Sequence, residues 1–212
     1  MNVVVLVSGR GSNLRAICEA VDAGACDAVI VGVVSDRKTA AALEFAEQRG
    51  IATRVVSFRK GTERRAWNEL LAQEVHALGP DLVVLAGFMR VLGAPVLERF
   101  PGRIINVHPA LLPSFPGHNA PQEALDGGVR ISGCTVHIVD AGVDTGPILA
   151  QAAVPVLADD TADTLHARIQ IQEHRLLPRV IQQIAVGRIT LDPLRVGTPV
   201  SDTTRSLTVP DV

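Results

Sequence analysis

The sequence contains few aromatic residues and no tyrosine. Aromatic side chains make up 3% of its 212 residues, with five Phe and one Trp. Proteins that bind single-stranded nucleic acid stack bases on such side chains, so their scarcity argues against that class. The formal charge is -2, from 20 basic and 22 acidic residues. That balance excludes a polybasic protein whose affinity comes from neutralising phosphates, and we expect no nucleic-acid partner.

Cysteine and long apolar runs are also scarce. Cys18, Cys26 and Cys134 form no C-x-x-C pair and leave an odd count, which argues against a disulfide framework and a thiolate zinc site. This usage fits a reducing cytoplasm. The apolar runs are too short for a signal peptide or a membrane span. The sequence therefore predicts a soluble cytoplasmic protein with no metal and no membrane partner.

Apolar strands that alternate with helical segments dominate what is present. Hydrophobic residues make up 47% of the chain, and runs such as Val3–Val7 and Val29–Ser35 are typical of buried strands. Their alternation with amphipathic segments predicts an α/β fold, an open, mostly parallel, twisted sheet of Rossmann-like type with helices on both faces. Segments 130–139 and 148–156, joined by a polar loop, predict an added C-terminal antiparallel hairpin.

The C-terminal part predicts the limit of a single domain. Residues 161–186 have helical periodicity, and Pro178 predicts a kink or a break in that helix. We expect the domain to span residues 1–190. Residues 191–212 are rich in Ser, Thr, Pro and Asp and are predicted to form a partly disordered tail.

A glycine-rich loop follows the first predicted strand. Gly11, Ser12 and Asn13 lie at the start of the next helix, where glycine permits close approach and free N–H groups favour an anion. Leu14 occupies the place of the third glycine in a dinucleotide fingerprint, and no GK[ST] follows. A single phosphate monoester is the better interpretation. A tight structural turn with a capped helix fits the same residues equally well.

A second candidate site lies at the end of a predicted buried strand. Strand alternation places Asn106 and His108 on one face, at the edge where open parallel sheets bind ligands. His can move a proton near neutral pH, and Asn can donate a hydrogen bond to a developing oxyanion. A lone His is more often a hydrogen-bonded structural residue. The loop 140–147 holds Asp144, which could orient His108, but it could also be a simple hairpin turn.

Taken together, these segments resemble the folate-dependent glycinamide ribonucleotide formyltransferases. The resemblance runs from residue 1 to about residue 187. It is carried by VVVLVSGRGSNL at the start, DLVVLAGFMRVL at 81–92, INVHPALLPSFPG at 105–117, GCTVHIVDAGVDTGPILAQ at 133–151 and RIQIQEH at 168–174. The order and spacing of these segments make the match specific.

The resemblance implies a role for each matching residue. The implied catalytic residues are Asn106, His108 and Asp144. The residues implied to bind the ribonucleotide are Gly11, Ser12, Asn13, Gln170 and Glu173. The residues implied to bind folate are Arg64, Met89, Arg90, Val91, Leu92, Asp140, Ala141, Gly142 and Val143. His137 resembles a structural histidine near the active centre, and the segment His118-Asn119 departs from the family pattern.

The resemblance also implies a reaction. The amine of glycinamide ribonucleotide attacks the formyl group of 10-formyltetrahydrofolate, a co-substrate, without a covalent enzyme intermediate. Asn106 and a protonated His108 stabilise the oxyanion. Asp144 keeps His108 charged, since a carboxylate raises a histidine pKa, and it relays a proton. The implied partners are the ribonucleotide and folate, and the enzyme would be a monomer or a homodimer.

Three other functions remain to be weighed. A 10-formyltetrahydrofolate hydrolase, the main alternative, would have less need of the loop at 8–13. Methionyl-tRNA formylation would need a nucleic-acid-binding domain and a basic surface. A catalytically silent folate- or nucleotide-binding module is opposed by the intact set of Asn106, His108 and Asp144.

Overall fold

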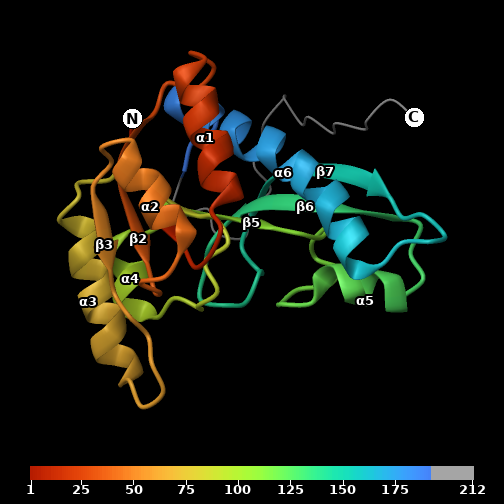
Figure 1. Cartoon of the computed structure of the whole chain (residues 1–212), viewed down its shortest axis with the longest axis horizontal. Helices are drawn as coiled ribbons and strands as arrows, with labels where there is room; N and C mark the ends of the chain where they lie inside the picture. Colours follow the sequence, from red (N-terminus) through yellow and green to blue (C-terminus); the bar gives the residue numbers. More distant parts are fainter. Residues whose placement is uncertain (192–212) are drawn as a thin grey trace.

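The fold is built on one mixed sheet. A computed structural model describes residues 1–191 of the chain. Within them the strands are ordered β3-β2-β1-β4-β5-β6-β7 (Figure 1). Their bounds are Asn2–Val7 (β1), Val29–Ser35 (β2), Thr53–Val55 (β3), Leu82–Leu85 (β4), Ile104–His108 (β5), Ile131–Ile138 (β6) and Ile148–Pro155 (β7). Strands β1 to β5 pair in parallel, whereas β6 and β7 are antiparallel.

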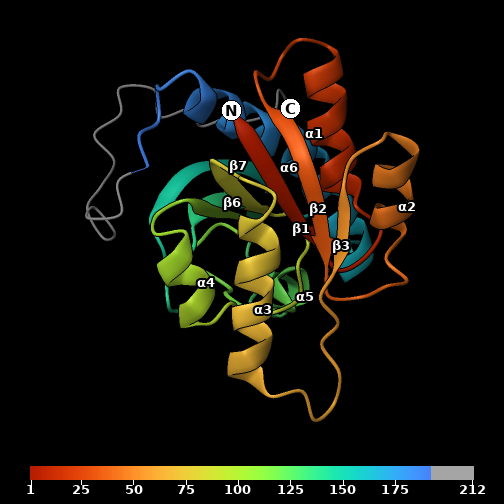
Figure 2. The same cartoon turned by 90° about the vertical axis from the view of Figure 1, so that its left-hand side faces the viewer.

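Helices cover both faces of the sheet, as predicted. Helices α1, α2 and α6 lie on one face and α3 and α4 on the other (Figure 2). Helix α5 packs on the side of α6. The helices span Ser12–Asp22 (α1), Ala41–Gln48 (α2), Arg64–His76 (α3), Ala94–Arg99 (α4), Ala120–Asp126 (α5) and Ala162–Ala185 (α6).

Two hydrophobic clusters explain why the central strands read as continuous apolar runs. Val3, Val5 and Val7 of β1 join the cluster under α1, α2 and α6, whereas Val4 and Leu6 join the cluster under α3 and α4. A strand buried on both faces needs apolar residues at every position. The fully buried pattern of β1 after its first residue is the result.

The structure differs from the sequence predictions in two helices. No helix was predicted between residues 118 and 129, yet α5 forms there with Pro121 in its first turn, where proline needs no hydrogen-bonded N–H. Of the two predicted effects of Pro178, the break is wrong, because α6 continues without interruption from Ala162 to Ala185, and the kink stays a prediction. Pro178 is buried within it, so tertiary packing compensates for the lost backbone bond.

The end of the described chain belongs to the core. Ile189 is buried and packs in the same cluster as α6. Apart from Leu191, the predicted tail over 191–212 lies outside the described residues. In the described part of the chain, no helix combines the length and apolar character needed to cross a membrane.

Candidate active site

A pocket opens where the helix layer stops. Helices α3 and α4 pack over β1 and β4, with Val4, Leu6 and Ile104 beneath them. Beyond them, over β5 and β6, lies a pocket of about 310 Å³. It is lined by Leu85, Gly87, Phe88, Met89, Arg90, Val91, Leu92, Asn106, Val107, His108, Pro109, Gly117, His118, His137, Val139, Asp140, Gly142, Val143 and Asp144. This size is within the range of small-molecule sites.

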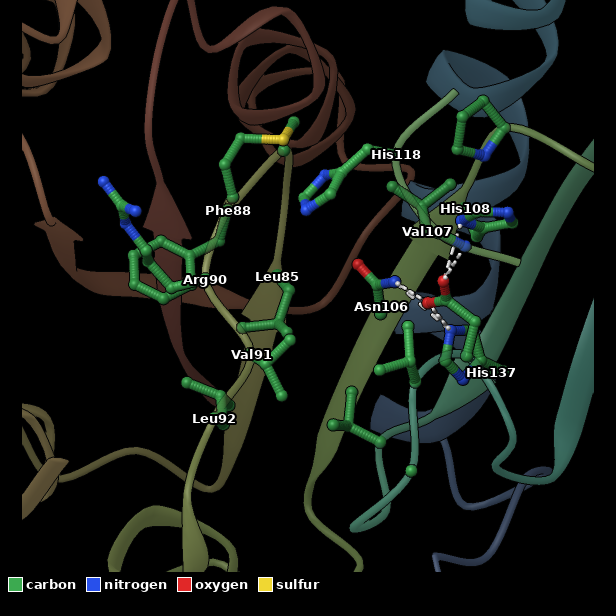
Figure 3. A pocket seen from close by; sticks show the side chains of 18 of the residues that line it. Leu85, Phe88, Arg90, Val91, Leu92, Asn106, Val107, His108, His118 and His137 are labelled. Carbon is green, nitrogen blue, oxygen red and sulfur yellow. Dashed lines mark hydrogen bonds and ion pairs between the residues drawn. The ribbon is translucent and has the colours of Figure 1, made fainter. Parts of the chain in front are cut away.

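Three polar side chains enter the pocket from two neighbouring strands. Asn106 and His108 are two residues apart on β5 and share a face, as alternation predicts. His137 on β6 lies directly opposite Asn106 in the antiparallel register. Figure 3 shows these side chains on one wall, facing Leu85, Phe88 and Leu92 across the pocket. The site therefore lies where the parallel and antiparallel parts of the sheet meet.

Asp144 completes the polar wall from the loop between β6 and β7. Its Oδ2 accepts a bond from the Gly117 backbone N–H at 2.9 Å and lies 3.4 Å from His108 Nδ1. Its Oδ1 lies 3.3 Å from Asn106 Nδ2 and 3.5 Å from His137 Nε2. The backbone of Asp144 has a φ of 54°, a left-handed conformation that is uncommon without glycine.

Asp144 is ionised at neutral pH. Burial by itself raises the pKa of this carboxyl group, because it disfavours the charged form. The hydrogen bonds from His137 and Gly117 and the electrostatic effect of the two neighbouring histidines outweigh burial and lower the pKa to about 2. The carboxylate is thus available as a proton acceptor and as an orienting group.

His108 differs from its predicted state. Burial lowers the pKa of His108, and this effect exceeds the opposite effects of the Phe115 carbonyl and Asp144. The prediction that Asp144 keeps His108 charged is therefore wrong for the protein without substrate. His108 Nε2 lies 2.8 Å from the Phe115 carbonyl oxygen, which can only accept. This contact places the proton of the neutral ring on Nε2 and leaves the lone pair of Nδ1 beside Asp144.

Asn106 is also held by this network. Its Nδ2 atom lies 3.2 Å from His137 Nε2 and donates to Asp144 Oδ1. His137 Nδ1 lies 2.9 Å from the Ile138 carbonyl oxygen, which can only accept, so this ring nitrogen carries a proton. The amide oxygen of Asn106 points away from His137 (Figure 3). Donation by Asn106 to an oxyanion therefore requires substrate to compete with Asp144 and His137.

The loop at residues 8–13 meets α6, far along the chain. Asn13 Nδ2 donates to Glu173 Oε2 at 2.9 Å, and both residues are buried. Burial raises the pKa of Glu173 in spite of this bond. Gln170 is half-buried one turn earlier on α6. The structure thus brings the predicted ribonucleotide residues of the loop and of Glu173 together.

Gly11 lets this loop pass close to α2. It has a φ of 76°, and a Cβ atom there would lie 2.6 Å from Ala42 Cβ. Ser12 begins α1, and Gly11 precedes the helix as its cap without a side-chain bond. The N–H groups of the first turn are therefore left to another acceptor.

The predicted folate segment forms the opposite wall. Met89, Arg90, Val91 and Leu92 all line the pocket. Arg64 Nη2 donates to the Val91 carbonyl at 2.8 Å. Its neighbour Arg65, which is exposed as Arg64 is, pairs instead with Glu69 on the surface of α3. Arg64, and not Arg65, is the residue placed against this wall.

The loop before β7 places most, but not all, of its predicted folate residues at the pocket. Asp140, Gly142 and Val143 line the pocket, but Ala141 does not. Asp140 Oδ1 accepts bonds from the Gly142 N–H and the Thr145 hydroxyl, so part of its role is to shape the loop. Within residues 1–191, no group of three or more His, Cys, Asp or Glu side chains is arranged to hold a metal ion.

Sequence reasoning missed several residues of the site. Phe88 lines the pocket, and Asp36 pairs with Arg90 Nε at 2.8 Å. His118, identified only as a departure from the family pattern, lines the pocket as well. His137 was assigned only a structural place. The strand alternation that identified Asn106 would have placed His137 on the pocket face once β6 was aligned with β5. No pattern in the sequence links Asp36 with a residue 54 positions away.

Comparisons with known proteins point to one family. The family description "Formyl transferase" matches residues 1–181. The chain is 42% identical to phosphoribosylglycinamide formyltransferase of Escherichia coli K12, over 90% of both chains. It is 47% identical to the protein of that name from Mycobacterium tuberculosis, over 89% of this chain and 87% of the relative.

Longer proteins and solved structures match as well. The trifunctional purine biosynthetic protein adenosine-3 of Bos taurus is 42% identical over 89% of this chain, which spans only 19% of that relative. Glycinamide ribonucleotide transformylase 1 from Symbiobacterium toebii has a similar structure, with a TM-score of 0.87 and 45% identity over 91% of each chain.

Proposed function

The chain belongs to the formyl transferase family, and from this we propose that it transfers the formyl group of 10-formyltetrahydrofolate to the amine of glycinamide ribonucleotide, a step of purine synthesis. The relatives that it covers over most of their length carry this activity in their names. The observation that supports the proposal most is the ionised carboxylate of Asp144 in contact with Asn106 and His108 beside the pocket.

The ribonucleotide is bound by the loop at 8–13 and by α6. The free N–H groups at the start of α1 favour the phosphate of the substrate. Gly11, Ser12 and Asn13 provide these groups, and Glu173 accepts hydrogen bonds from the ribose hydroxyls. Asn13 and Glu173 are already joined at 2.9 Å. Gln170, on the same side of α6, completes this set.

Folate is bound between the two walls of the pocket. The apolar side chains of Met89, Val91 and Leu92 and the loop residues Asp140, Gly142 and Val143 bury its ring. Arg64, which donates to the Val91 carbonyl, faces its acidic end, and Arg90 supports the wall that contacts the ring. The co-substrate supplies a formyl group on a nitrogen that can leave. The mostly apolar lining, with polar groups concentrated on one wall, is the pattern expected of such a site.

Proton transfer is carried out by the Asp144 network. The substrate amine must lose a proton as it attacks, and Asp144 is a carboxylate at neutral pH. The unprotonated Nδ1 of His108, 3.4 Å from Asp144 Oδ2, can take up this proton and become a cation only while it is needed. A cation at His108 and an N–H of Asn106 then stabilise the negative charge on the formyl oxygen. As this intermediate collapses, the bond between the formyl carbon and N10 of the folate breaks, and the proton taken up from the amine passes to the departing nitrogen.

A comparison of two assays tests the proposed reaction. Deformylation of 10-formyltetrahydrofolate is followed with and without glycinamide ribonucleotide. We expect tetrahydrofolate to form only when the acceptor is present, with one formylated ribonucleotide per turnover. Equal rates with and without acceptor would replace the proposal with the hydrolase. Absence of both reactions would leave only a binding module.

The remaining features of the proposal concern the setting of the enzyme. We expect a cytoplasmic enzyme, monomer or homodimer, that acts without a metal, a nucleic acid or a membrane. The near-neutral charge supports the expectation that neither a nucleic acid nor a membrane is a partner. Sedimentation of the pure protein across a range of concentrations distinguishes the monomer from the dimer.

A further inference from the structure

A buried carboxylate lies behind the folate wall and takes no part in the proposed chemistry. Asp36 directly follows β2, and its side chain is 0% exposed. An ionised carboxylate in such a place is unfavourable unless it is paired. The nearest cation is Arg90, whose Nε donates to Asp36 Oδ2 at 2.8 Å. The Oδ1 atom of Asp36 has no hydrogen-bond partner among the described residues.

Arg90 is held from a second direction by an aromatic ring. Its guanidinium lies 4.8 Å from the centroid of Phe58, a distance typical of a cation–π contact. Trp67 packs edge-on against the same ring at 5.0 Å. The Arg90 side chain runs from the pocket wall away from Asn106 and His108 (Figure 3), and its guanidinium is held by both Asp36 and Phe58.

The wall itself has no regular secondary structure between β4 and α4. Side chains from several elements hold it instead. Ser8 Oγ accepts from the Met89 N–H at 2.9 Å, and Arg64 donates to the Val91 carbonyl. The Gly93 N–H donates to Asn68 Oδ1 at 2.6 Å. Among these four contacts, the Asp36–Arg90 pair is the one that involves a fully buried carboxylate.

We infer that Asp36 is a positioning residue for folate binding, because it anchors Arg90 and so keeps the wall of residues 89–92 in the shape that accepts the folate ring. The inference rests on the proposed function only for the identity of the ligand. A segment without ladder hydrogen bonds gains affinity when it is ordered before the ligand binds. Asp36 provides this order without contacting the ligand.

The test uses Asp36→Asn and Asp36→Ala in the full-length protein. Binding of tetrahydrofolate is measured by the fluorescence of Trp67, the one tryptophan of the chain, which stacks on the pocket residue Phe88 at 6.4 Å. We expect the Kd to rise about tenfold for Asp36→Ala and about threefold for Asp36→Asn, which keeps an acceptor oxygen but no charge. At saturating folate, kcat should be unchanged.

Two further measurements separate positioning from other roles. Tetrahydropteroate, which lacks the glutamate, should lose as much affinity as tetrahydrofolate, because the wall and not the charge is disturbed. In an Arg90→Met background, Asp36→Asn should have no additional effect on Kd, since the two residues act through one contact. Loss confined to the glutamate-bearing ligand, or additive effects of the two substitutions, would overturn the inference.

A matched control exists in the same chain. Asp160 also pairs with an arginine, Arg168, and its side chain is 2% exposed against 0% for Asp36. Asp160→Asn should lower the melting temperature and leave the Kd for tetrahydrofolate unchanged. An equal change of Kd in both variants would mean that Asp36 acts only on overall stability. These titrations need no turnover, so the absence of formyl transfer would reject the proposed function and not this inference.

Discussion

At the residue scale, the chemistry of the site depends on how the proton is shared between Asp144 and His108. Burial acts against charge on both groups. It wins at His108, which is 4% exposed, and loses at Asp144, where the hydrogen bonds and charges of its neighbours prevail. The result is a carboxylate beside a neutral imidazole, which is the state needed to accept a proton.

Removal of either partner should slow the reaction strongly. We expect Asp144→Asn and His108→Ala each to lower kcat by at least about a hundredfold, in line with general acid–base contributions. Steady-state kinetics with both substrates measure this. Asp126→Asn, which changes an exposed carboxylate at the end of α5, serves as the control and should keep wild-type kcat. Near-normal turnover in both site variants would contradict the assigned roles.

Protonation of Asp144 should make the protein less stable in acid. Its pKa is about 2 in the folded protein against an ordinary value of 3.8, and a lowered carboxyl pKa contributes stability above the unfolded pKa. This contribution of about 2 kcal/mol is lost as the pH falls through the folded pKa, with about 1 kcal/mol lost by pH 3. Urea unfolding of wild type and Asp144→Asn at pH 7, 4 and 3 measures the difference in slope.

Between pH 4 and pH 3, the free energy of unfolding should decrease less for Asp144→Asn than for wild type. Asp126→Asn should follow the wild-type curve, because its carboxylate is exposed. Parallel curves for wild type and Asp144→Asn would mean that the carboxyl group is not stabilised in the folded state.

Sequence reasoning predicted the meeting of Asn106 and His108 because strand alternation is local. The place of Asp144 depended on a family resemblance, since a loop position has no periodicity. The charge state of His108 could not be predicted, because its pKa is set by burial and by the Phe115 carbonyl. Asp36 follows β2 and Arg90 lies in the segment between β4 and α4. No local pattern in either segment predicts that the two side chains meet.

At the element scale, the contact between the loop at 8–13 and α2 is a steric one. Gly11 and Gly24 flank α1, and both have positive φ values. A Cβ atom on Gly11 would meet Ala42, whereas a Cβ atom on Gly24 would meet nothing within 4 Å. Comparison of substitutions at the two positions therefore separates the effect of backbone strain from the effect of close packing.

Gly11→Ala should be more harmful than Gly24→Ala. The left-handed backbone disfavours both variants by about 1 kcal/mol, and overpacking adds roughly 1–3 kcal/mol at Gly11 alone. Chemical denaturation measures both values. We also expect the KM for the ribonucleotide to rise only in Gly11→Ala. Equal stability of the two variants would show that the loop can move away from α2.

The extent of the helices was the least predictable feature of the fold. The helix over residues 162–185 was expected from its period, but its continuity through Pro178 depends on neighbours that only the fold brings near. Helix α5 is short and lies among prolines, so its period is too weak to detect. The antiparallel hairpin of β6 and β7 was confirmed, since two strands joined by a polar loop rarely form a crossover.

At the scale of the whole molecule, alternation of strands and helices was enough to predict the mixed sheet and its two helix layers. The order of the strands and the place where one helix layer stops were not predictable. They depend on which strands pair, a contact between residues far apart in sequence. The pocket lies at that limit, over β5 and β6.

The proposed domain boundary can be tested by truncation. A chain that ends at residue 191 should keep the melting temperature and kcat of the full chain. A chain that ends at residue 186 should lose stability, because it lacks the buried Ile189, whose burial contributes about 1.5–3 kcal/mol. Thermal unfolding compares the three chains. A large loss of stability in the chain that ends at residue 191 would place part of the domain beyond that residue.

The bond between Ser8 Oγ and the Met89 N–H has one more consequence. It joins the loop at 8–13, which would bind the nucleotide, to the wall of residues 89–92, which would bind the pterin, so a shift of one segment strains or breaks a bond to the other. Thermodynamic reciprocity then applies: if occupancy of one half tightens or loosens the second, the second must act back on the first by the same factor. Measurement of either affinity in the presence of the other ligand would give the cooperativity of both.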